Sequence, residues 1–108
     1  MQIDLVRGTL DLLILKALSW GPMHGLAVLR WIEQTTCDQL QIEEGALYPA
    51  LHRMEEKGWL EADWGYTERN RKAKFYRLTP RGRKHLVAEV QRWNRYTDVV
   101  GLVIQAVR

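Results

Sequence analysis

The sequence predicts a mainly α-helical domain that carries one small β-hairpin. Three observations support this prediction. Apolar residues recur at helical spacing in four segments. Between the third and fourth segments, apolar and polar residues alternate, which is typical of paired strands. The length of 108 residues suits one domain with a single modest core.

The first helical segment, residues 8–19, is apolar around nearly its whole circumference. Such a helix is buried on more than one side, which is hard to arrange within one short chain. We therefore expect part of it, including Leu10 and Leu13, to face a second subunit. Trp20-Gly21-Pro22 then ends the segment as a turn.

Two further helices are predicted before the hairpin. One runs from His24 to about Thr36, with His24 as a cap or turn residue, and residues 39–42 (QLQI) can then pair briefly as a strand. The other begins at Glu43 or Glu44 and ends at Gly58, because glycine adopts the left-handed conformation that closes a helix. Pro49 is tolerable there because little helical bonding is lost near the first turns.

Residues 59–79 predict a two-stranded ribbon. Its first strand is expected to bury alternate side chains: Leu60, Ala62 and Trp64. On the second strand, the apolar residues Tyr76 and Leu78 alternate with Phe75 and Arg77. The polar tip between the strands contains Gly65 and Asn70, which we expect to adopt positive φ angles.

A long last helix is predicted after the ribbon. Thr79-Pro80 is a strong helix start, because threonine caps the first turn and proline at its first position loses no hydrogen bond. One face of this helix has a seam with spacings of 4 and 3: Leu86, Val90, Trp93, Thr97, Val100, Ile104 and Val107. This heptad-like seam predicts a helical partner.

Positive charge is concentrated in one short stretch. The formal net charge is +3, yet residues 66–84 hold eight basic side chains and one acidic one, while residues 1–65 are net acidic. Such a patch favours an anionic polymer as partner, although a solvated hairpin is the simpler alternative. Four of the bases lie on or beside the ribbon tip: Arg69, Arg71, Lys72 and Lys74.

Other functional classes find little support. The single cysteine, Cys37, allows no internal disulfide, and we expect it to be packed. The three histidines lack metal-ligand spacing, and no catalytic constellation or phosphate-binding glycine loop is present. We therefore expect no enzyme, metal or cofactor. Without a signal peptide or an apolar run of roughly 20 residues, a cytoplasmic protein away from the membrane is predicted.

Three helices followed by a basic ribbon are the order of a winged helix-turn-helix, whose third helix enters the DNA major groove. We assign residues 1–79 to this unit and residues 80–108 to a carboxyl-terminal dimerisation helix. The outer face of the third helix carries the remaining candidate DNA contacts: Gly45, Tyr48, Pro49, His52 and Arg53. Arg53 can instead pair with Glu55 or Glu56. Tyr48 can be a buried or merely exposed aromatic residue, and His52 an ordinary surface histidine.

Several residues together resemble the PadR family of bacterial transcriptional regulators, over roughly residues 5–93. The resemblance rests on Gly21-Pro22, His24-Gly25, Gly45, Leu47-Tyr48-Pro49-Ala50-Leu51, Gly58, Arg71, Tyr76, Leu78-Thr79 and Gly82. The single final helix is similar to that of the smaller subfamily. The chain departs from the usual pattern at Leu26, where relatives commonly have an aromatic residue, and at Trp59, which replaces an aliphatic one.

The resemblance implies a homodimeric repressor in which the last helix packs against the first and last helices of the other subunit. Two recognition helices, about 34 Å apart or a near multiple, would then bind a roughly palindromic operator in double-stranded DNA. Trp93 occupies the place of a tryptophan that stacks on small aromatic effectors in some relatives, although a role in the dimer core alone is simpler. The alternative function is a winged-helix module that binds another protein.

Overall fold

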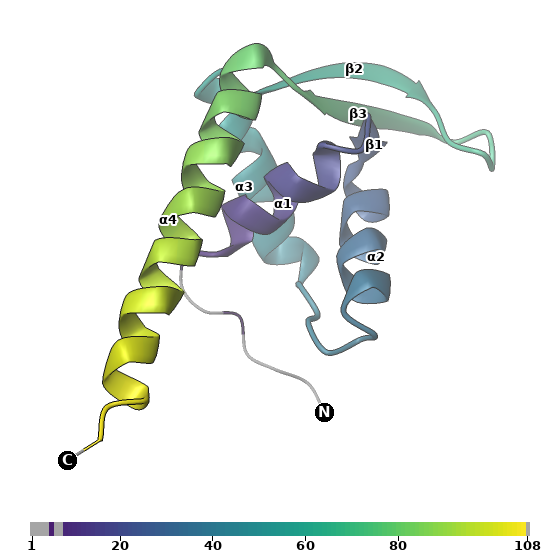
Figure 1. Ribbon diagram of the computed structural model, residues 1–108. Helices are drawn as coiled ribbons and strands as arrows, with labels where there is room; N and C mark the ends of the chain where they lie inside the picture. The colour runs from purple at the N-terminus through teal and green to yellow at the C-terminus, as the bar shows by residue number, and fades with distance from the viewer. Residues whose placement is uncertain (1–4, 6–7, 108) are drawn as a thin grey trace.

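The computed structural model describes Leu5 and residues 8–107 (Figure 1). Its elements are α1 (Leu10–Leu18), β1 (Met23–His24), α2 (Gly25–Thr35), α3 (Glu44–Glu56), β2 (Leu60–Tyr66), β3 (Lys72–Leu78) and α4 (Pro80–Ile104). The four predicted helices and the ribbon are confirmed. None of the described helices has the length and hydropathy needed to cross a bilayer. Residues 1–4, which bear on the signal-peptide expectation, lie outside the described part.

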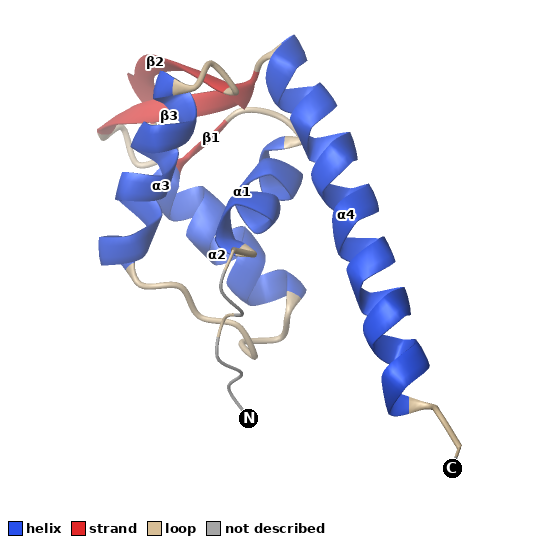
Figure 2. Cartoon of the chain, turned by 90° about the vertical axis from the view of Figure 1, so that its left-hand side faces the viewer, coloured by secondary structure: helices blue, strands red, loops and turns tan. Residues whose placement is uncertain are grey.

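Helices α1, α2 and α3 pack together next to the sheet, and α4 runs along one side of them (Figure 1). The carboxyl-terminal half of α4 extends away from the other helices, as the turned view shows (Figure 2). We call β2, β3 and the turn between them, residues 67–71, the wing. The wing extends past the helices in the opposite direction to the end of α4 (Figure 1).

The core lies where the first three helices meet the base of the wing. Its largest fully buried side chains are Ile14, Leu15, Leu18, Val28, Ile32, Leu47, Leu51, Met54 and Leu60. Burying each such side chain contributes about 1.5–3 kcal/mol to folding. The predicted stripe of α3, Leu47, Ala50, Leu51 and Met54, is buried throughout. Because this stripe holds α3 against the core, the opposite face of α3 is turned outward.

The sheet is antiparallel with the strand order β1-β3-β2. The strand predicted at residues 39–42 is wrong, because Met23 and His24 form the third strand instead, opposite Tyr76 and Phe75 of β3. Residues 39–42 form a connection whose two apolar side chains pack on the helical core. Their alternation therefore serves helix packing rather than a sheet.

Three other local expectations are wrong. Trp64 is 66% exposed, because the outer half of β2 extends past the helices that would cover it. Gly65 has no positive φ; instead, a Cβ added there would lie 3.1 Å from the ring of Phe75 on the neighbouring strand. Cys37 is exposed rather than packed, since it lies in the left-handed turn that follows α2, with φ 52°. Asn70 has the expected positive φ of 58°.

The start of α4 is tied to the end of α3. Thr79 caps α4 as predicted, because its Oγ1 accepts a hydrogen bond from the Gly82 N–H at 3.0 Å. The same hydroxyl donates to the carbonyl of Gly58 at 2.6 Å, and the Thr79 N–H donates to the carbonyl of Trp59 at 3.1 Å. Gly58 has φ 79°, which confirms its predicted left-handed turn. This joint fixes the direction in which α4 leaves the domain.

Candidate nucleic-acid interface

The outward face of α3 brings together the residues that the sequence nominated there. Gly45, Tyr48, Pro49, His52 and Arg53 are all exposed. No atom of the described residues lies within 4 Å of a Cβ added at Gly45, so a ligand can approach the backbone closely at that position. Pro49 is the sixth residue of the helix, and it has no N–H to donate to the carbonyl of Gly45. The face is therefore open, and its amino-terminal part is stiffened by proline.

Tyr48 is held by the beginning of α2. Its side chain is 44% exposed, and its Cε1 would lie only 2.6 Å from a Cβ added at Gly25. Gly25 follows His24, whose Nδ1 accepts a hydrogen bond from the Ala27 N–H at 3.3 Å and so confirms the predicted cap. Glycine at residue 25 lets the tyrosine ring lie against the α2 backbone. This contact joins residues of two different helices and does not follow from the sequence pattern, although the His24-Gly25 pair is part of the family resemblance.

The two other polar residues of the face have acidic partners. His52 Nε2 lies 2.7 Å from Glu56 Oε1, one turn further along α3. Arg53 pairs with Asp11 of α1 at 2.5 Å, and not with Glu55 or Glu56, the two partners that the sequence suggested. Exposed pairs of this kind contribute about 0–1 kcal/mol each, so both side chains can exchange their partners for a ligand at little cost.

The tip of the wing is a short hydrogen-bonded turn. The Thr67 N–H donates to the carbonyl of Arg71 at 2.9 Å, and Thr67 Oγ1 accepts from the Arg71 N–H at 3.2 Å. Arg69, Arg71 and Lys72 are exposed on this turn and beside it. Within the described residues, no acidic side chain lies within ion-pair distance of these three bases. Their charge is therefore available to a phosphate.

Lys74 differs from the other predicted wing bases. Its Nζ donates to Glu55 Oε1 of α3 at 2.9 Å and lies 5.5 Å from the ring centre of Tyr76. The hydrogen bond to Glu55 is the main cause that raises the pKa of Lys74 above its ordinary value. Burial raises the pKa of the Tyr76 hydroxyl as well. The ion pair thus links the wing to α3, and Lys74 contacts DNA only if it leaves Glu55.

The sequence profile of the Transcriptional regulator PadR-like family matches residues 14–88, more than half of the chain. The chain belongs to this family. An uncharacterised protein from Lysinibacillus sphaericus is 30% identical over 105 residues, which cover 97% of this chain and 96% of that protein. Membership in the PadR-like family makes the chain a DNA-binding transcriptional regulator and not an enzyme.

Solved structures agree with this assignment. A transcriptional regulator from Clostridium thermocellum superposes with a TM-score of 0.82 at 28% identity, over 92% of this chain and 96% of that one. A PadR family transcriptional regulator from Eggerthella lenta superposes with a TM-score of 0.81 at 30% identity, over 94% of this chain and 86% of that one. The winged-helix fold is thus common to this chain and to both solved regulators.

The predicted seam of this PadR-like chain is largely uncovered. Leu86 is buried, and Leu10 and Leu13 of α1 are half-buried against the core. The remaining seam positions are all exposed: Val90, Trp93, Thr97, Val100, Ile104 and Val107. Trp93 is 37% exposed, and its ring centre lies 6.5 Å from that of Tyr96. Beyond Leu86, the apolar stripe of α4 is thus left uncovered by the rest of the described chain.

Proposed function

We propose that this PadR-like regulator is a homodimeric repressor that binds a roughly palindromic operator. The observation that supports it is the arrangement of α3, whose open face carries Tyr48 against the start of α2. Arg69 and Arg71 of the wing, which follows α3 in the chain, have no acidic partner among the described residues. A face of this composition suits contacts to base edges, with phosphate contacts beside it.

Recognition of the operator is divided between α3 and the wing. Tyr48 and His52 contact base edges in the major groove, and Gly45 allows the backbone to approach. Arg69, Arg71 and Lys72 bind phosphates along the DNA backbone. Arg53 and Lys74 join these contacts by exchanging Asp11 and Glu55 for phosphate oxygens.

Dimerisation is assigned to α4. The exposed apolar residues of the seam form the dimer interface, together with the half-buried Leu10 and Leu13 of α1. They pack against a second copy of the chain in a heptad-like pattern. We retain the functional division into residues 1–79 for DNA binding and residues 80–108 for dimerisation. The hydrogen bonds of Thr79 support the proposal that the two parts form one structural unit, because they hold the start of α4 to the end of α3.

A small planar aromatic effector is the proposed ligand of the dimer. Trp93 is accessible in the single chain and lies on the seam, where the two subunits would meet. An effector stacked on Trp93 would change the spacing of the two recognition helices and release the operator. The protein would act in the cytoplasm.

A gel-shift titration with duplex DNA at two salt concentrations tests the DNA-binding proposal. Each phosphate neutralised contributes about 0.9 to the slope of log affinity against log salt, so a steep salt dependence is expected and Arg71→Ala should reduce it. The competing function is a protein-binding module, which the exposed Trp64 and Tyr66 of the wing favour. Salt-insensitive or absent DNA binding would support the protein-binding module.

A further inference from the structure

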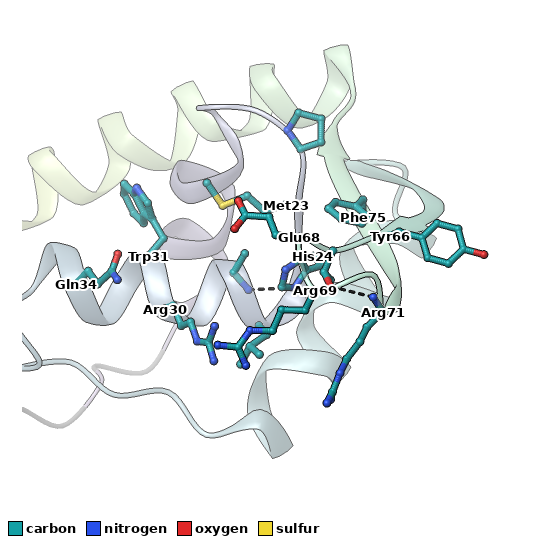
Figure 3. A pocket seen from close by; sticks show the side chains of 14 residues that line it. Met23, His24, Arg30, Trp31, Gln34, Tyr66, Glu68, Arg69, Arg71 and Phe75 are labelled. Atoms are coloured by element: carbon teal, nitrogen blue, oxygen red, sulfur yellow. Dashed lines mark hydrogen bonds between the residues drawn. The ribbon is translucent and has the colours of Figure 1, made fainter.

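An open groove of about 650 Å³ separates α2 from the wing (Figure 3). Its apolar lining includes Leu26 and Trp31 of α2 and Phe75 of β3. Its charged lining includes Arg30 of α2 and Arg69 and Arg71 of the wing turn. Arg30 was not among the residues that the sequence nominated, since a single arginine on the polar side of a helix is usually a solvated surface residue.

The three arginines are free of acidic partners among the described residues, and the groove contains one acidic side chain, Glu68. Other basic residues nearby behave differently, since Arg53, Lys74 and Arg77 are each held by a carboxylate. Arg30 and Arg69 come from separate elements and project toward one another (Figure 3). Like charges gathered in this way produce a positive potential that attracts an anion.

The groove and the outward face of α3 both border the first turn of α2. His24, at the start of α2, pairs with Phe75 of β3, so the first turn of α2 is attached to the wing. The next residue, Gly25, contacts the ring of Tyr48 on α3. The arginine-lined groove and the tyrosine face therefore meet at the first turn of α2.

We propose that Arg30 binds a DNA phosphate and that, with Arg69 and Arg71, it holds one strand of the backbone between α2 and the wing. This inference rests on the proposed function and extends the contact surface to α2. A guanidinium group can bind phosphate oxygens through two parallel hydrogen bonds, and three guanidinium groups line the open groove. Such contacts position the protein without distinguishing base sequence.

The test uses the full chain with Arg30→Gln. Affinity is measured for a duplex from the region upstream of its own gene and for an unrelated duplex of equal length, over a range of salt concentrations. Arg30→Gln should weaken binding to both duplexes by the same factor and lower the salt slope by about 0.9 for each subunit bound. Arg30→Lys keeps the charge and should retain most of the slope.

Arg83→Gln is the matched control, because it removes the same charge from an exposed position of α4 outside the groove. It should leave affinity and slope unchanged, and thermal unfolding should be the same for all variants. Unchanged binding by Arg30→Gln, while Arg71→Gln weakens it, would overturn the role of Arg30 and leave the proposed function intact. Weakened binding to one duplex alone would also overturn it, because base-specific contact is then required.

If Arg71→Gln and Tyr48→Ala also leave binding unchanged, the proposed function itself fails, and the role of Arg30 fails with it. The set of variants therefore separates an error about one residue from an error about the whole surface.

Discussion

Helices α3 and α4 both carry an apolar stripe at helical spacing, yet the two stripes differ in what covers them. The stripe of α3 is buried by α1, α2 and the base of the wing. The stripe of α4 is buried only as far as Leu86, and from Val90 onward it is exposed. Periodicity thus predicts that a face is apolar, whereas the length and direction of the helix decide whether the same chain can cover it.

A charge placed in each stripe should have the largest effect, and a different one for each helix. Val100→Asp should abolish dimers while leaving the monomer folded, because an unpaired charge at a buried interface costs about 3–5 kcal/mol. Leu51→Asp, in the stripe of α3, should instead unfold the chain at any protein concentration. Sedimentation and circular dichroism distinguish the two results. Dimers that persist in Val100→Asp would refute the seam.

The joint between the end of α3 and the start of α4 should be the next most sensitive to substitution. A Cβ added at Gly82 would lie 2.0 Å from the carbonyl oxygen of Trp59, so the backbone must shift to accept Gly82→Ala. Overpacking of this kind costs about 1–3 kcal/mol or more, which urea unfolding measures. Gly101→Ala on the exposed part of α4 meets no atom within 4 Å and is the control. Equal stability of the two variants would show that the joint tolerates strain.

The position of the Tyr48 ring should control the affinity for DNA. Tyr48→Ala should lower specific affinity by about 1–3 kcal/mol if the side chain contacts a base edge. Gly25→Ala should produce a similar loss of affinity although Tyr48 itself is unchanged, because the new methyl group displaces the tyrosine ring. Titration of the operator by fluorescence anisotropy measures both. Full affinity in Gly25→Ala would mean that the ring position is unimportant.

Removing the ion pair between Lys74 of the wing and Glu55 of α3 should have the smallest effect on stability. The pKa of Lys74 is raised in the folded chain. Its charged side chain therefore contributes fully to stability below the ordinary pKa of 10.5, and this contribution is lost as the pH rises above that value. Tyr76 changes stability in the same direction, because burial also raises its pKa. Stability should therefore decline in alkali.

Lys74→Met should remove part of that alkaline decline and cost about 1 kcal/mol or less at neutral pH. Glu55→Gln should have the same consequence, and the double variant should lose no more than either single variant. Additive losses in urea unfolding at pH 8 and above would show that the two side chains do not act as a pair.

Much of the fold could be predicted because the signals are local. The His24 and Thr79 caps, the glycine turn at Gly58 and the buried stripe of α3 each depend on residues within a few positions of one another. The errors occurred where packing overrides local pattern. Trp64 has the alternation of a buried residue but lies where no helix covers β2, and residues 39–42 use their alternation to anchor a connection.

Only part of the candidate site could be predicted from the sequence. The sequence was sufficient to nominate the outer face of α3 and the bases of the wing tip, since helical periodicity and local charge define both. It could not show that Gly25 supports Tyr48, or that Arg30 lies across a groove from Arg69. Those relations depend on how α2 packs between α3 and the wing.

Local patterns in the sequence were enough to predict the four helices, the ribbon, the buried stripe of α3 and the stretch where positive charge gathers. Which charges remain free depends on how the helices and the wing pack together. Arg53 is paired with a carboxylate 42 residues away, and Lys74 with one 19 residues away, whereas Arg69 and Arg71 meet no such partner in the described chain. The physical reason is that an ion pair depends on distance in space, which no short stretch of sequence specifies.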